Sequence, residues 1–114
     1  MPKILIHSSQ APVTGFTDHS KPLPLAQATR AGDMLYVSGQ GPLDPQTREV
    51  VAGGIAEQTR QTLGNLKAIL QAADAGMAQV VNMRVCLRDT ADFPAFNEAF
   101  RDFTDGQKGT RTCT

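Results

Sequence analysis

The chain has 114 residues, a formal net charge of zero and only two cysteines. This length fits one domain with a single core, and the balanced charge argues against a nucleic-acid surface or a polybasic membrane patch. Cys86 and Cys113 form no CxxC pair, and His7 and His19 lack the spacing of zinc ligands. No apolar stretch reaches the length of a membrane span. We therefore expect one cytoplasmic domain, residues 1–114, without a metal, a nucleic-acid partner or a membrane partner.

The first part of the chain predicts strands and one long loop. Apolar and β-branched runs predict strands at residues 3–7, 25–30 and 34–39. Residues 8–24 are rich in Ser, Thr, Pro and Gly, which is typical of a loop. The turn signal at residues 31–33 joins the second and third strands, so we expect an antiparallel hairpin there.

Two later segments have the period of a helix. The first runs from Ile55 to Ala73, and we expect Gly76 to form its C-terminal cap. Its predicted buried face consists of Ile55, Thr59, Thr62, Leu63, Leu66, Ile69, Leu70 and Ala73. The second helix follows a cap at Asp89 or Thr90 and carries a stripe of aromatic side chains. This stripe, which we interpret as the main core anchor, consists of Phe93, Phe96, Phe100 and Phe103.

Residues 80–88 alternate cleanly between apolar and polar side chains, which predicts a strand with two different faces. Residues 109–114 look like the beginning of a further strand. The order of elements predicts an α+β fold in which two helices pack on one face of a mixed sheet. The polar face of strand 80–88 must then meet solvent or another subunit, and we expect oligomerisation to cover the free face of the sheet.

Several stretches in this order resemble the RidA family, also called YjgF. They are AQATRAGDMLYVSGQGPLDPQT, EQTRQTLGNLKAIL, VVNMRVCLRDTADFPAFNEAF and RTC. The resemblance implies a chorismate-mutase-like fold and a homotrimer with clefts between neighbouring subunits. It also implies hydrolysis of reactive enamine and 2-imino acids to 2-keto acids and ammonia. Such hydrolysis needs no metal or organic cofactor.

The resemblance also implies a substrate site. Arg111 matches the arginine that holds the substrate carboxylate, a group that a guanidinium grips bidentately. Cys113 lies two residues further along the strand, on the same face. Ser38, Gly39 and Asn97 match residues near the ligand.

Each of these side chains also has a purely structural interpretation. Arg111 could be a surface residue, and Cys113 a small buried apolar residue. Ser38 could be a satisfied hydroxyl on a strand, and Asn97 could fix a loop by an internal hydrogen bond. No residue is assigned a catalytic role, because no base stands beside Cys113 in the sequence.

Two departures from the family pattern weaken the expectation of catalysis. Leu25 stands where active deaminases carry a tyrosine, and nothing follows Thr114, where the family has a last strand with a water-positioning glutamate. We expect that strand to be absent from this domain and the deaminase activity to be impaired. The alternative is a non-catalytic trimer that binds small imino or keto acids. Ribonuclease activity ranks third, because the chain offers no basic and aromatic surface.

Overall fold

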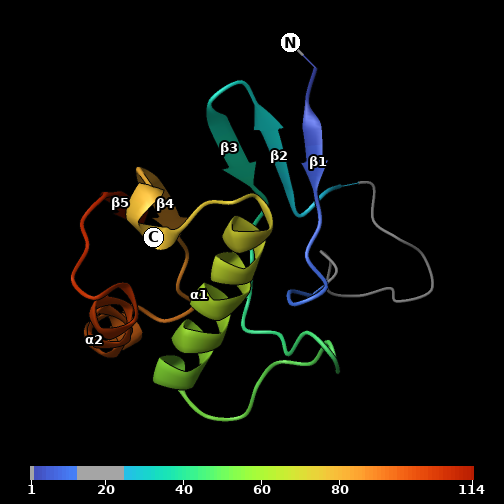
Figure 1. Cartoon of the computed structure of the whole chain (residues 1–114). Helices are drawn as coiled ribbons and strands as arrows, with labels where there is room; N and C mark the ends of the chain where they lie inside the picture. The colour runs from blue at the N-terminus through green and yellow to red at the C-terminus, as the bar shows by residue number, and fades with distance from the viewer. Residues whose placement is uncertain (1, 13–24) are drawn as a thin grey trace.

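The computed structural model describes residues 2–12 and 25–114 (Figure 1). The strands are β1 (Ile4–Ile6), β2 (Ala28–Ala31), β3 (Met34–Val37), β4 (Asn82–Val85) and β5 (Thr110–Cys113). The helices are α1 (Ile55–Ala72) and α2 (Phe93–Thr104), and short 3₁₀ turns lie at Met77–Gln79 and Thr90–Asp92. The α+β fold with two helices is therefore confirmed, as is the order of its elements. Most of the loop expected over residues 8–24 lies outside the described residues.

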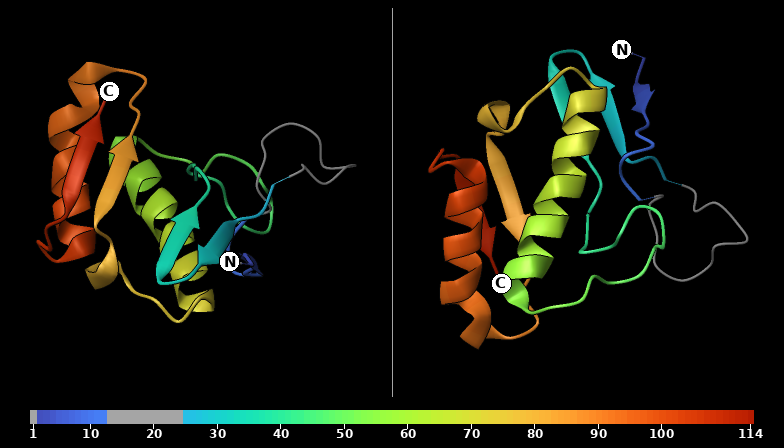
Figure 2. Two further views of the ribbon diagram at one scale, coloured as in Figure 1. Left: turned by 90° about the horizontal axis from the view of Figure 1, so that it is seen from above. Right: turned by 60° about the horizontal axis from the view of Figure 1, so that its bottom comes forward.

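The strands form two sheets instead of one continuous sheet. β1, β2 and β3 make an antiparallel sheet in that order, whereas β4 and β5 pair in parallel. α1 crosses behind both sheets, and α2 lies beside α1 on the β4–β5 side (Figure 2). Parallel and antiparallel pairs are both present, as a mixed sheet requires, but no pairing joins β3 to β4 among the described residues.

Both ends of α1 are held by local hydrogen bonds. At its start, the Gly54 N–H donates to the Glu57 carboxylate at 2.9 Å. At its end, Asp74 adopts a left-handed conformation with φ 59°, and the Ala75 N–H donates to the Leu70 carbonyl. This is a Schellman cap. The expectation that Gly76 caps α1 was wrong, because Asp74 already turns the chain and Gly76 instead precedes the 3₁₀ turn.

The core centres on α1. Ile69 is fully buried and packs with Ala28 and Ala11, while Leu35 and Val37 of β3 border the same cluster. The phenylalanine stripe of α2 contributes less than expected, since Phe96 is buried but Phe93 is 38% exposed. The long apolar face of α1, and not the aromatic stripe, therefore anchors the fold.

The buried Gln27 side chain links the N-terminal segment to the start of β2 by hydrogen bonds. The Gln27 carboxamide accepts a hydrogen bond from the Ser8 N–H at 2.6 Å and donates to the Pro12 carbonyl at 2.9 Å. It also donates to the carbonyls of Ser8 and Ala11. Because Gln27 is only 4% exposed, these bonds compensate the cost of burying its amide.

The outer face of the β1–β3 sheet is partly apolar. Leu5, Thr29 and Tyr36 lie in one cross-strand row, and Met34 lies next to it on the same face. Leu5 is 64% exposed and Tyr36 is 59% exposed. β4 shows the expected alternation, with Met83 and Val85 half-buried and Asn82 and Arg84 exposed. Among residues 2–12 and 25–114, no other element covers the side of the sheets opposite α1.

Candidate functional site

The predicted site residues of the chain terminus lie on β5, which is held against β4. Arg111 is the pairing partner of Met83, and Cys113 is the partner of Val85. Gly109 brings the chain into this strand, and a β-carbon there would lie 2.9 Å from the Val80 carbonyl oxygen. Only glycine allows that approach. The alternation of β5 leaves Arg111 and Cys113 half-buried on one face, as the two-residue spacing predicted.

Arg111 is seated against α2. One terminal nitrogen of its guanidinium donates to the Asn97 Oδ1 at 2.6 Å. The guanidinium carbon lies 4.9 Å from the centroid of the Phe100 ring, 5.3 Å from that of Phe96 and 5.8 Å from that of Phe93. A cation near aromatic faces is attracted by their quadrupoles. Arg111 is therefore a positioned residue and not a loose surface side chain.

The same geometry gives the aromatic stripe a second role. Phe93, Phe96 and Phe100 follow one another on one face of α2, and Asn97 interrupts that face with its single polar side chain. Core packing alone, which was our interpretation of the sequence, misses this role. The signal that could have revealed it is an asparagine at position i+4 within an aromatic stripe at i, i+3 and i+7.

Arg111 keeps donors for a ligand. A guanidinium has five N–H donors, and the bond to Asn97 is the only hydrogen bond of Arg111 within the described residues. The two-pronged N–H geometry matches a carboxylate. Asn97 makes an internal hydrogen bond, but its partner is Arg111 on β5 and not a loop. Its expected contact with a ligand stays a prediction.

Cys113 has a free thiol and is half-buried. Among the described residues, no hydrogen bond involves its sulfur, and no histidine, lysine or carboxylate pairs with it. A thiol without a neighbouring base is a poor nucleophile. Cys113 lies on the same face of β5 as Arg111. Its surroundings give no support to covalent catalysis.

Ser38 and Gly39 lie where β3 ends. The Ser38 hydroxyl donates to the Ala26 carbonyl at 2.6 Å, and the Ser38 N–H donates to the Gln27 carbonyl at 2.9 Å. Its donor is therefore used within the hairpin, as the structural interpretation proposed. Gly39 is exposed, and its α-carbon faces open space. The hydroxyl oxygen of Ser38 can still accept a hydrogen bond.

The segment after Gly39 is held by α1 through a residue that sequence reasoning missed. The buried Asn65 side chain donates to the Gly41 carbonyl at 3.1 Å and to the Leu43 carbonyl at 2.9 Å, and its own oxygen accepts from Gln61 at 2.9 Å. A polar residue inside the apolar face of a helix, next to Leu66, was the available signal. Asn65 thereby fixes the path of the chain that follows Ser38.

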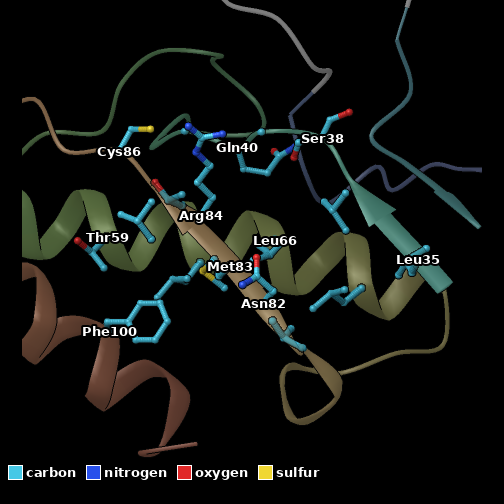
Figure 3. Close-up of a pocket in the computed structure, with 18 of the residues that line it drawn as sticks. Leu35, Ser38, Gln40, Thr59, Leu66, Asn82, Met83, Arg84, Cys86 and Phe100 are labelled. Carbon is cyan, nitrogen blue, oxygen red and sulfur yellow. The ribbon is translucent and has the colours of Figure 1, made fainter. Parts of the chain in front are cut away.

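Within one chain the predicted residues form two groups. Ser38 and Gly39 line a groove of about 980 Å³ that runs over α1 between β3 and β4 (Figure 3). Arg111, Cys113 and Asn97 do not line this groove. They lie on the other side of β4, between β5 and α2.

Comparison with known proteins shows the family to which the chain belongs. A family profile described as endoribonuclease L-PSP matches residues 19–114. The chain belongs to this family. It includes the proteins named RidA and UK114, so the resemblance seen in the sequence is confirmed. Family membership accounts for the fold.

Individual relatives give the same assignment. A RutC family protein from Pyrococcus horikoshii is 43% identical over 98 residues, which cover 84% of this L-PSP family chain and 78% of the relative. A 2-iminobutanoate/2-iminopropanoate deaminase from Dermatophagoides farinae is 36% identical over 80 residues, which cover 70% of this chain and 62% of the deaminase.

Two solved structures confirm the fold at higher coverage. E. coli TdcF with bound serine superposes with a TM-score of 0.86 and 32% identity, covering 97% of this chain and 84% of that chain. RidA from an Antarctic Psychrobacter superposes with a TM-score of 0.84 and 31% identity at the same coverage.

No helix of the described residues is long and apolar enough to cross a membrane. Nowhere in residues 2–12 and 25–114 do three side chains of His, Cys, Asp or Glu gather in a way that could hold a metal ion.

Proposed function

We propose that this L-PSP family protein binds small 2-imino acids by their carboxylate at Arg111 and hydrolyses them to 2-keto acids and ammonia. The observation that carries the proposal is the seating of Arg111 by Asn97 and the faces of three phenylalanines. A guanidinium held in this way is preorganised, so less side-chain entropy is lost when a carboxylate binds. The deaminase from Dermatophagoides farinae among the relatives supports the choice of substrate class.

The chemistry asks little of the protein. Water adds to the electrophilic carbon of the C=N bond, a proton reaches the nitrogen, and ammonia leaves as the carbonyl forms. The protein must hold the carboxylate, orient the imine and admit one water molecule. Arg111 supplies the first of these functions, and no organic cofactor or metal is needed for the others.

We further propose that the complete site forms between subunits of a homotrimer. The two groups of predicted residues lie apart within one chain, so a neighbouring subunit must bring Ser38 and Gly39 of one copy towards Arg111 of another if they act together. The uncovered outer face of the β1–β3 sheet, with Leu5, Met34 and Tyr36, supports such an association. Exposed apolar surface of this kind is typical of subunit contacts.

The proposal is tested by steady-state turnover of 2-iminobutanoate, generated in situ from threonine, with release of 2-ketobutyrate as the readout. We expect Arg111→Ala to reduce kcat/KM by roughly 100-fold, because a charge-assisted bidentate contact contributes about 3 kcal/mol. Arg101→Ala is the matched control, since Arg101 is an exposed arginine of α2 that pairs with Glu98 on the surface. Turnover that survives Arg111→Ala at the level of the control would refute the assignment.

A second candidate function is carboxylate binding without turnover. It is favoured by Leu25, a 51% exposed apolar side chain that offers no hydrogen bond to water or substrate. In that case calorimetry would detect 2-ketobutyrate binding that depends on Arg111, while the turnover assay would give no signal. Ribonuclease activity, which the family name mentions, remains the least supported candidate because the net charge is zero.

A further inference from the structure

Among the described residues, two carboxamides are buried inside the fold, those of Gln27 and Asn65. The other buried polar side chains are short hydroxyls, and those of Thr59 and Thr104 donate to the carbonyl four residues earlier in their own helix. Burying a carboxamide is costly unless its polar groups find partners. The partners of these two show which part of the chain they hold in place.

Asn65 holds the chain that follows Gly39. Its amide donates to the carbonyls of Gly41 and Leu43, and its oxygen accepts from Gln61. Connecting segments usually run over the surface, where water satisfies their backbone groups. These two carbonyls are instead bonded to a side chain on the buried face of α1. The chain is therefore fixed two and four residues beyond Gly39.

Gln27 holds the chain on which Ser38 rests. The Ser38 N–H donates to the Gln27 carbonyl at 2.9 Å, and the Ser38 hydroxyl donates to the Ala26 carbonyl at 2.6 Å. The Gln27 side chain is itself bonded to the backbone of residues 8–12. Residues 26 and 27 therefore cannot shift without breaking several hydrogen bonds, and Ser38 is fixed from this side.

The two carboxamides thus act on the same short segment from its two ends. Figure 3 shows Ser38 at the end of β3 and Gln40 shortly after it, on the side of β4 that faces this strand. A β-carbon on Gly39 would meet nothing within 4 Å, and no hydrogen bond within the described residues uses the Gly39 N–H. Gly39 therefore takes its position from its neighbours in the chain, and its N–H is left for a ligand.

We propose that Asn65 and Gln27 are positioning residues of the proposed deaminase site. They hold Ser38 and Gly39 so that the Ser38 oxygen and the Gly39 N–H meet the imine end of a substrate whose carboxylate lies on Arg111 of a neighbouring copy. This inference rests on the proposed function and on the proposed site between subunits. Neither carboxamide touches the substrate, so the loss of either one changes the orientation of the imine and not the hold on the carboxylate.

The test measures kcat and KM for 2-iminobutanoate and Kd for 2-ketobutyrate in Asn65→Leu and Gln27→Leu. We expect kcat to fall by about tenfold in each variant, because the reacting group is misplaced, while KM and Kd change by less than about twofold. A purely structural role would lower the stability of the variants and leave kcat of the folded protein unchanged. Sedimentation velocity verifies that the variants assemble as the wild type does.

Leu70→Ala is the control matched for stability. Leu70 is a buried apolar residue of the same helix, so its truncation should destabilise the fold without removing a side-chain bond to the segment after β3. All variants are assayed well below their unfolding temperatures. If Asn65→Leu does not fold, Asn65→Ser takes its place, because its single hydroxyl cannot replace both amide donors. Equal kcat in the Asn65 variant and the control would overturn the proposal.

NMR order parameters of the ligand-free protein separate a failure of this inference from a failure of the proposed function. The backbone amides of Gly39, Gln40 and Gly41 should be rigid in the wild type, with order parameters of about 0.85, and should fall below about 0.6 in the Asn65 variant. Unchanged values would overturn the inference even in an active deaminase. A wild type that neither turns over 2-iminobutanoate nor binds 2-ketobutyrate would refute the proposed function, and this inference with it, whatever the order parameters are.

Discussion

At the scale of single residues, the contact between Asn97 and Arg111 joins a helix to the proposed ligand site. The Asn97 oxygen accepts one guanidinium N–H at 2.6 Å and leaves the others for a carboxylate. Removing that acceptor should free the guanidinium to move over the phenylalanine rings. A charged acceptor in its place should instead compete with the ligand.

We therefore predict that two Asn97 variants lose affinity for 2-ketobutyrate for different reasons. Asn97→Ala should raise the Kd for 2-ketobutyrate by about tenfold, because a hydrogen bond to a charged group contributes roughly 1.5 kcal/mol or more. Asn97→Asp should also raise the Kd, but it should stabilise the free protein through an ion pair with Arg111. Calorimetric titration and thermal unfolding of both variants check this, and unchanged affinity in both would show that Asn97 does not position Arg111.

Asn65 is the residue whose loss should cost most stability. Asn65→Leu removes both donors to the Gly41 and Leu43 carbonyls and leaves the Gln61 amide without its acceptor. We expect the free energy of unfolding to fall by about 2–4 kcal/mol, the cost of leaving buried polar groups unpaired. Urea unfolding measures this. Gln71→Leu, an exposed substitution on the same helix, is the control and should change the same quantity by less than about 1 kcal/mol.

At the scale of elements, the start of α1 carries a charge-dependent contribution to stability. Backbone N–H groups of Glu57 itself and of Gly54 lower the pKa of the Glu57 carboxyl, and the charge of Arg60 lowers it slightly further. A lowered folded pKa means that this contribution is present above the unfolded value of about 4.3. It is lost as the pH falls through the lower folded value.

This gives a pH-dependent prediction for Glu57→Gln. The glutamine can still accept from Gly54 but carries no charge, so the variant should be less stable than the wild type at neutral pH. As the pH falls from the unfolded value of about 4.3 through the lower folded pKa, the wild-type carboxyl is protonated and the difference in unfolding free energy should vanish. Unfolding by urea across this range measures the difference. A constant difference at every pH would contradict the electrostatic origin.

At the scale of the whole molecule, the uncovered outer face of the β1–β3 sheet has to be explained. Tyr36 and Leu5 are neighbours in one row of this face, and both are more than half exposed. If the face is buried between subunits, a charge placed there should prevent association at a modest cost to the fold of the single chain. The charge would be solvated in the separate chain and desolvated in the trimer.

We predict that Tyr36→Asp converts the proposed trimer into a monomer in sedimentation velocity experiments. Gln107→Asp, an exposed substitution in the turn after α2, should leave the sedimentation coefficient unchanged. Circular dichroism of both variants verifies that they fold. A wild-type chain that sediments as a monomer at all concentrations would remove the basis for a site shared between subunits.

The fold was largely predictable because its signals are local. The period of α1 and the alternation of residues 80–88 depend on neighbours within one element, and both are confirmed by the structure. The division into two sheets was not predictable from these patterns, because strand pairing joins segments far apart in the chain. The Gly76 cap was wrong for a simpler reason: Asp74 can adopt a left-handed conformation although it is not glycine.

The geometry of the candidate site was predictable only in part, and the role of its residues in ligand binding stays a prediction. The spacing of Arg111 and Cys113 on one strand predicts a shared face, which the structure shows. Nothing in the spacing indicates that the Arg111 side chain packs against the phenylalanine rings of α2. Likewise, Asn65 and Gln27 bind carbonyls about 20 residues away in the sequence, and no local pattern encodes such partners.

The exposed position of Tyr36 also makes it a built-in optical reporter. The chain has one tyrosine and no tryptophan, so excitation near 280 nm addresses a single, known side chain whose phenol lies on the uncovered face of the β1–β3 sheet. Acrylamide should quench it readily in the free chain and poorly once another subunit covers that face. Assembly can therefore be followed in the unmodified protein, without an attached dye or an introduced tryptophan.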